Sequence, residues 1–124
     1  MGRIRNLQKR KTNPRLVNLI DLLLKESAKN DAGIWKYVAK RLALPTRRWA
    51  EVGLDKIEKY ANEGEYVVVP GKVLGGEIRK AVKVAAFSFS AAAKTKIKEA
   101  GGEWMSIEYL LKLNPSGKGV RILI

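Results

Sequence analysis

The chain has 124 residues, of which 46% are hydrophobic, and its formal net charge is +13. This size and apolar fraction predict one domain with a modest core, and they exclude a wholly disordered basic tail. Cys and His are both absent, which excludes disulfides, the usual zinc sites and the commonest catalytic bases and nucleophiles. No apolar stretch is long enough to cross a bilayer, so we expect a soluble, cytoplasmic protein.

The N-terminal third predicts a basic arm followed by two helices. Residues 1–12 contain few sizeable apolar groups, so we expect an arm that stays flexible until it meets negative charge. Residues 13–124 then form a single globular domain. Asn13-Pro14 predicts a helix N-cap and first-turn proline, and the leucine-rich helix that follows runs to about Lys29. A second helix begins after Gly33 and ends before Pro45.

From Val52 onward, short apolar runs alternate with short amphipathic runs, which predicts strands alternating with helices. We expect strands at Val52–Leu54, Tyr66–Val69, Val82–Phe87, near Trp104-Met105 and at Val120–Leu123, with helices at Asp55–Ala61, Ser90–Ala100 and Ser106–Leu113. Pro70-Gly71 is typical of a turn and 72–76 of a glycine-rich loop. The fold class is therefore α/β, with N-terminal helices followed by irregular stacked β/α units.

Two of these units match each other at an offset of 53 residues. The pattern of strand, short helix, glycine turn and strand that begins near Val52 recurs near Met105, and Gly64 corresponds to Gly117. This predicts an internal structural repeat. Because few positions are identical, convergence on a common β-α-β pattern is the alternative.

The basic residues are concentrated in three windows, 1–20, 32–50 and 78–98. These windows hold 17 of the 25 Lys and Arg residues and none of the 12 acidic residues. Such a distribution opposes folding by self-repulsion unless a partner supplies negative charge, and a phosphate backbone is the usual supplier. A single window of this kind would indicate ordinary solvated charge, but three favour a nucleic-acid partner.

Trp49 and the helix after Ser90 each have two interpretations. Trp49 follows Arg47-Arg48 and could stack on a base or anchor the core. The helix combines small alanines with Lys94, Lys96 and Lys98, so its first turn could approach a phosphate or simply pack on a sheet. Trp35 lies on an apolar helix face and is expected to be structural.

Catalysis and cofactor binding are not predicted. The loop 71–76 lacks the Lys-Ser/Thr ending of a P-loop, and Glu77 would repel phosphate. Most acidic residues stand beside Lys, as solvated helix surface does. We therefore predict neither an enzyme, nor a cofactor, nor a metal site.

Several strings resemble known ribosomal families. They are Lys72-Val73-Leu74-Gly75, Val84-Ala85-Ala86-Phe87-Ser88-Phe89-Ser90 and Ala100-Gly101-Gly102. These are similar to the segment shared by bacterial large-subunit ribosomal protein fifteen and archaeal/eukaryotic large-subunit ribosomal protein eighteen-e. The N-terminal Asn13-Pro14 helix, Val67–Lys72 and the ending Asn114–Arg121 resemble the eighteen-e family, and the short C-terminus is similar to that of its archaeal members. The resemblance implies a short superhelix of β/α turns and a structural role in the large (50S) subunit.

The expected function is therefore to bind and stabilise large-subunit (23S) rRNA through basic patches, beside neighbouring ribosomal proteins and with no membrane or small-molecule substrate. The alternative is a non-ribosomal RNA- or DNA-binding architectural or chaperone protein. The predicted RNA-binding residues are Arg3, Arg5, Lys9, Arg10, Lys11, Arg15, Lys36, Lys40, Arg41, Arg47, Arg48, Trp49, Lys72, Arg79, Lys80, Lys94 and Lys118. Arg favours bidentate phosphate contacts, and Lys favours point-charge neutralisation.

Overall fold

The computed structural model describes residues 13–124, so the predicted arm and its five basic residues lie outside the described residues. The two N-terminal helices are α2 (Pro14–Asn30) and α3 (Gly33–Ala43). The Asn13 Oδ1 atom accepts hydrogen bonds from the amides of Arg15 and Leu16 at 3.0 and 3.4 Å. The predicted cap is thus confirmed, and it satisfies two of the amides that a helix start leaves unpaired.

After α3 the chain forms a short 3-10 turn and then β/α units around one sheet. The elements are η1 (Thr46–Arg48), β1 (Ala50–Gly53), α4 (Leu54–Tyr60), β2 (Tyr66–Leu74), β3 (Lys83–Phe89), α5 (Ala91–Glu99), β4 (Glu103–Ser106), α6 (Ile107–Leu113) and β5 (Val120–Ile122). All strand pairs are parallel, in the order β1-β2-β3-β4, and β5 also pairs with β2. The predicted mixed α/β class is confirmed.

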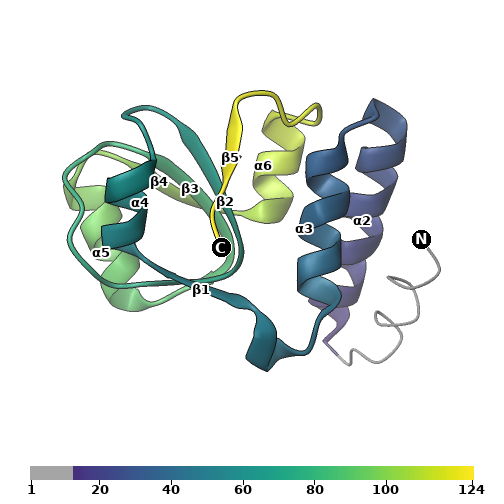
Figure 1. The fold of residues 1–124 in the computed structure, drawn as a ribbon, viewed down its shortest axis with the longest axis horizontal. Coiled ribbons are helices and arrows are strands. Elements are labelled where there is room, and N and C mark those ends of the chain that lie inside the picture. Colours follow the sequence, from purple (N-terminus) through teal and green to yellow (C-terminus); the bar gives the residue numbers. More distant parts are fainter. Residues whose placement is uncertain (1–12) are drawn as a thin grey trace.

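The chain path decides which helices cover which face of the sheet. From β1 to β4 the strands advance in one direction, whereas the connection from β4 to β5 returns across the sheet. Right-handed crossovers therefore require α6 on the face opposite α4 and α5. Figure 1 shows this arrangement, with α6 between the sheet and the α2–α3 pair.

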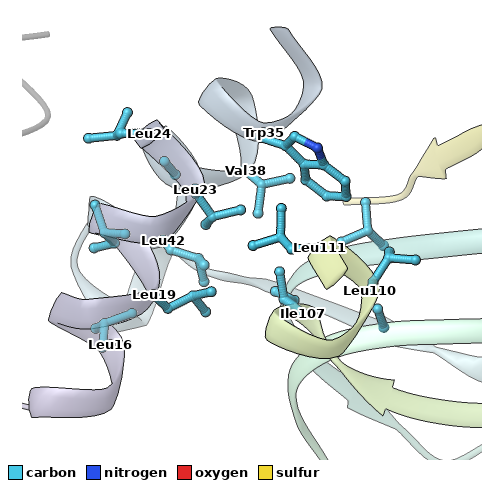
Figure 2. Packing of buried hydrophobic residues seen from close by; sticks show 14 of the residues in the cluster. Leu16, Leu19, Leu23, Leu24, Trp35, Val38, Leu42, Ile107, Leu110 and Leu111 are labelled. Atoms are coloured by element: carbon cyan, nitrogen blue, oxygen red, sulfur yellow. The ribbon is translucent and has the colours of Figure 1, made fainter. Parts of the chain in front are cut away.

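Two hydrophobic cores follow from this layering. One core joins α2, α3 and α6 to the sheet, and Figure 2 shows leucines of α2 facing Val38, Leu42 and α6. Trp35 is fully buried here, as predicted, and its Nε1 donates a hydrogen bond of 2.7 Å to the Pro115 carbonyl. The other core packs α4 and α5 against the opposite sheet face, through residues such as Ile57 and Ile97.

The internal repeat predicted from the sequence is present in the structure. The bounds of β1 and α4, shifted by 53 residues, are the bounds of β4 and α6. Gly64 and Gly117 both have positive φ, 78° and 71°, which glycine adopts without strain. The similarity therefore extends to backbone conformation.

The prediction of a turn at Pro70-Gly71 was wrong, and so was the loop start at Lys72, because β2 continues to Leu74. The register with β3 shifts between Val69 and Lys72, which marks a β-bulge. At the same place β2 changes its other edge partner, from β5 at 66–68 to β1 at 71–74. A bulge tolerates the missing amide of Pro70 inside a strand.

Candidate RNA-binding surface

A run of exposed cations follows α3 onto η1. Val38 and Leu42 bury one side of α3 in the core, so Lys36 and Lys40, one turn apart, lie on its exposed side. Arg47 and Arg48 are exposed on η1, shortly after the helix ends. We call Lys36, Lys40, Arg47 and Arg48 the α3–η1 patch.

The α3–η1 patch has no acidic partner within residues 13–124. The ion pairs of this part of the chain are Arg15–Glu108, Lys96–Glu77 and Arg121–Glu65. Like charges four residues apart on a helix repel each other. An external anion would therefore relieve the repulsion between the cations of the patch. Arg41, half-buried beside it, has a buried Nε without a hydrogen-bond partner among the described residues.

Arg15, predicted to bind RNA, is engaged by the fold itself. Its Nε and Nη2 atoms donate to the two carboxylate oxygens of Glu108 at 3.0 and 3.2 Å. Its Nη1 donates to the Phe87 carbonyl at 2.9 Å, and its guanidinium lies 4.1 Å from the Phe87 ring centroid. Arg15 thus links α2 to α6 and β3, in the bidentate geometry for which Arg is suited.

Trp49 anchors the segment after η1 to the core. Its Nε1 donates to the carbonyls of Leu42 and Leu44, at 3.2 and 3.0 Å, which satisfies acceptors at the end of α3. Its ring meets Phe87 edge-on, with centroids 5.1 Å apart. These contacts favour the core alternative for Trp49 over base stacking.

Lys80 and Arg79 lie beside the C-terminal end of α4. The Lys80 Nζ donates to the carbonyls of Glu58 and Ala61 at 2.8 and 3.0 Å, so it caps this helix. The backbone amides of Arg79 and Lys80 donate to Glu58 Oε1 and lower the pKa of that carboxyl below its usual value. Of these two side chains, that of Arg79 is exposed and that of Lys80 is half-buried.

The remaining predicted residues lie on β2, on α5 and in the turn before β5. Lys72 is exposed on β2, Lys118 is exposed before β5, and Lys94 is half-buried on α5, where its Nζ lies 4.7 Å from the Trp104 ring centroid. The glycine-rich segment is occupied by a carboxylate, because the Glu77 amide donates to Asp55 Oδ1 at 2.8 Å. It therefore offers no phosphate cradle.

Neither a metal-binding cluster nor a membrane-spanning helix is found in the part of the chain that the structure describes. Residues 13–124 contain no group of three or more acidic side chains that could hold a metal ion. No helix in the same range has the length and apolar character needed to span a bilayer.

Comparison with known proteins agrees with this surface. The chain matches the family described as "Ribosomal protein 60S L18 and 50S L18e" over residues 3–124. It is 66% identical to large ribosomal subunit protein eL18 of Archaeoglobus fulgidus, over 93% of this chain and 99% of that protein. The proteins of the same name from Methanoregula boonei and Methanococcus maripaludis are 55% and 50% identical over 91% and 90% of this chain, which covers 94% of each. The chain belongs to the L18e family.

Membership of the L18e family confirms the resemblance read from the sequence. L18e proteins are structural ribosomal proteins and not enzymes, as was expected here. The named relatives are archaeal, and a place in the cytoplasmic ribosome agrees with the family. The alternative of a non-ribosomal nucleic-acid-binding protein is not supported by any of these matches.

Sequence reasoning missed one group of residues in this L18e-family chain. Phe87, Phe89 and Trp104 meet where β3 and β4 end, together with the predicted Arg15 and Lys94. The signal in the sequence was partial, because Phe87-Ser88-Phe89 ends β3 whereas Trp104 is in register with Val84 and reaches Phe89 only through its large side chain. The signal was overlooked because Phe and Trp in strands are usually core residues.

Proposed function

We propose that this chain is a structural component of the large ribosomal subunit that binds 23S-type rRNA through phosphate contacts. The α3–η1 patch carries the proposal: four exposed cations that follow one another along α3 and η1, without an acidic partner among residues 13–124. Lys gives point-charge contacts along a backbone, while the paired guanidiniums of Arg47 and Arg48 suit bidentate phosphate grip.

The predicted basic residues have unequal parts in this proposal. Lys72, Arg79 and Lys118 are exposed and would add phosphate contacts from other segments of the chain. The five basic residues of the 1–12 arm stay a prediction for the same role. Arg15, Lys80 and Trp49 position the elements around them, because their polar groups are bonded within the protein.

The salt dependence of RNA binding tests the α3–η1 patch. Removing one phosphate-binding cation lowers the log–log slope of affinity against salt concentration by roughly 0.7–0.9. Arg47→Ala with Arg48→Ala should therefore reduce the slope by about 1.4–1.8 if each residue binds one phosphate. The ligand is purified 23S-type rRNA, and thermal unfolding of the variant checks that the fold is intact.

A matched control variant comes from the repeat. Lys59 and Lys112 are exposed in the last turns of α4 and α6, at equivalent positions of the two units. Changing both to Ala removes the same charge outside the patch, and the slope should fall by clearly less. Equal slopes for the two double variants would show that the binding follows net charge alone and would remove Arg47 and Arg48 from the interface.

Sedimentation tests the ribosomal role itself. Tagged protein in a cell lysate should migrate with large subunits through a sucrose gradient, and it should stay there at high salt. Recovery at the top of the gradient would contradict the proposal and favour free RNA or DNA as the partner.

A further inference from the structure

A small aromatic cavity opens at the carboxyl ends of β3 and β4. Its volume is about 280 Å³, and it is lined by the rings of Phe87, Phe89 and Trp104 and by the cations Arg15 and Lys94. In open parallel α/β sheets, ligands bind at this end of the strands. The cavity has room for one heterocyclic base and not for a double helix.

The rings of the cavity differ in how firmly the fold holds them. Phe87 is packed by Trp49 edge-on and by the Arg15 guanidinium, so it forms a fixed wall. Trp104 lies on the end strand β4 and is 37% exposed, with Phe89 beside it at a centroid distance of 5.7 Å. Trp104 is therefore the ring with surface left for a ligand.

The internal repeat shows that the fold does not require an aromatic residue at position 104. The corresponding position of the first unit is Glu51, an exposed acidic residue in β1. The buried position beside it is apolar in both units, Val52 in one and Met105 in the other. Core packing thus explains the apolar residue Met105, but it does not explain the large ring at position 104.

The charges around the cavity select the class of ligand. The Lys94 Nζ lies over the Trp104 ring and has no acidic partner among residues 13–124. Lys94 belongs to the first half of α5, whose exposed first residues, Ala91 and Ala92, are too small to block an approaching backbone. A flat apolar face with a cation at its rim matches a base attached to a phosphate.

We propose that this cavity receives one unpaired nucleotide of the RNA, with its base stacked on Trp104 and its phosphate neutralised by Lys94. The proposal rests on the proposed rRNA binding and adds a second mode to it. Phosphate contacts of the α3–η1 patch carry no sequence information, whereas a nucleotide that leaves its helix fixes the register of the protein on folded RNA. Arg15 and Glu108 hold the cavity wall in place and do not bind the base.

The test compares two RNA duplexes of the same sequence, one fully paired and one with a single bulged adenosine. The full chain should bind the bulged duplex more tightly, and the bulge should quench tryptophan fluorescence. Trp104→Ala should lower affinity for the bulged duplex by about 5- to 150-fold, the range for removal of one stacking interaction, and leave the paired duplex bound as before. Trp104→Phe should keep most of the preference but lose the quenching, which assigns the signal to Trp104.

Two outcomes separate this inference from the proposed function. Equal binding of both duplexes by the unchanged chain, without quenching, would overturn the nucleotide pocket while phosphate binding stands. Binding of neither duplex, nor of rRNA, would contradict the proposed function itself. Lys36→Gln with Lys40→Gln is the matched control, since it should weaken both duplexes alike and leave the quenching unchanged.

Discussion

Gly71→Ala should destabilise the fold severely, because the neighbouring strand β1 approaches this position too closely for a side chain. A Cβ atom built on Gly71 would lie 2.1 Å from the Ala50 carbonyl oxygen, whereas ordinary contacts begin near 3.4 Å. The β1 backbone would have to recede by about 1.3 Å, which the β1–β2 hydrogen bonds over Ala50–Gly53 cannot absorb. Overpacking costs about 1–3 kcal/mol of stability. The weakening of several hydrogen bonds, each of which contributes about 0.5–1.5 kcal/mol, adds to this cost.

The expected loss is about 3–5 kcal/mol, a large part of the roughly 5–15 kcal/mol that stabilises a domain. Urea unfolding followed by circular dichroism measures it. Gly33→Ala is the matched control: the same added atom meets no heavy atom within 4 Å at the start of α3, so it should stabilise by about 0.4–1 kcal/mol. A Gly71→Ala protein within about 1 kcal/mol of the parent would refute the close approach of β1 to β2.

Two further substitutions test contacts that join distant parts of the chain. The Arg121 guanidinium holds the pKa of the Glu65 carboxyl below its usual value. The pair therefore stabilises the fold above pH about 4.5, and this stabilisation is lost as the pH falls through the lowered pKa. Glu65→Gln should cost about 0.5–1 kcal/mol at pH 7 and leave a flatter acid limb in a pH series of unfolding experiments; a limb of unchanged shape would contradict the pairing. Trp35→Phe removes the donor to the Pro115 carbonyl and leaves unfilled volume beside α6. It should therefore lower the free energy of unfolding by about 1–3 kcal/mol. A neutral effect would show that α3 does not hold the 114–117 loop.

Local chemistry was enough to predict most elements of the fold. Asn13 and Ser90 specify helix starts through side-chain oxygens that accept hydrogen bonds from backbone amides of the first turn. The ring of Pro14 favours the same start at the first of these helices. The repeat could also be predicted from the sequence, because its strand, helix and glycine turn follow one another closely along the chain. In each case the residues that determine the structure are neighbours along the chain.

The bulge at Pro70-Gly71 could not be predicted on the same basis. Proline followed by glycine is a strong turn signal, and nothing nearby in the sequence contradicts it. The strand continues because β5, more than fifty residues later, and β1, about twenty residues earlier, share one edge of β2. Tertiary pairing overrides local preference here, and the glycine is required by the approach of Ala50 rather than by a turn.

The same distinction applies to the candidate RNA-binding residues. Counting charges along the chain locates basic windows, but it cannot show which cations are neutralised by the fold. Arg15 lies in an acid-free window, yet its partner Glu108 is 93 residues away and meets it only because α6 packs against α2. Arg47 and Arg48 come from a similar window and have no such partner within residues 13–124. Arginines that look equivalent in the sequence are thus expected to respond oppositely. Arg15→Ala should lower stability more than it lowers the RNA affinity of the folded protein, and removal of Arg47 and Arg48 should do the reverse.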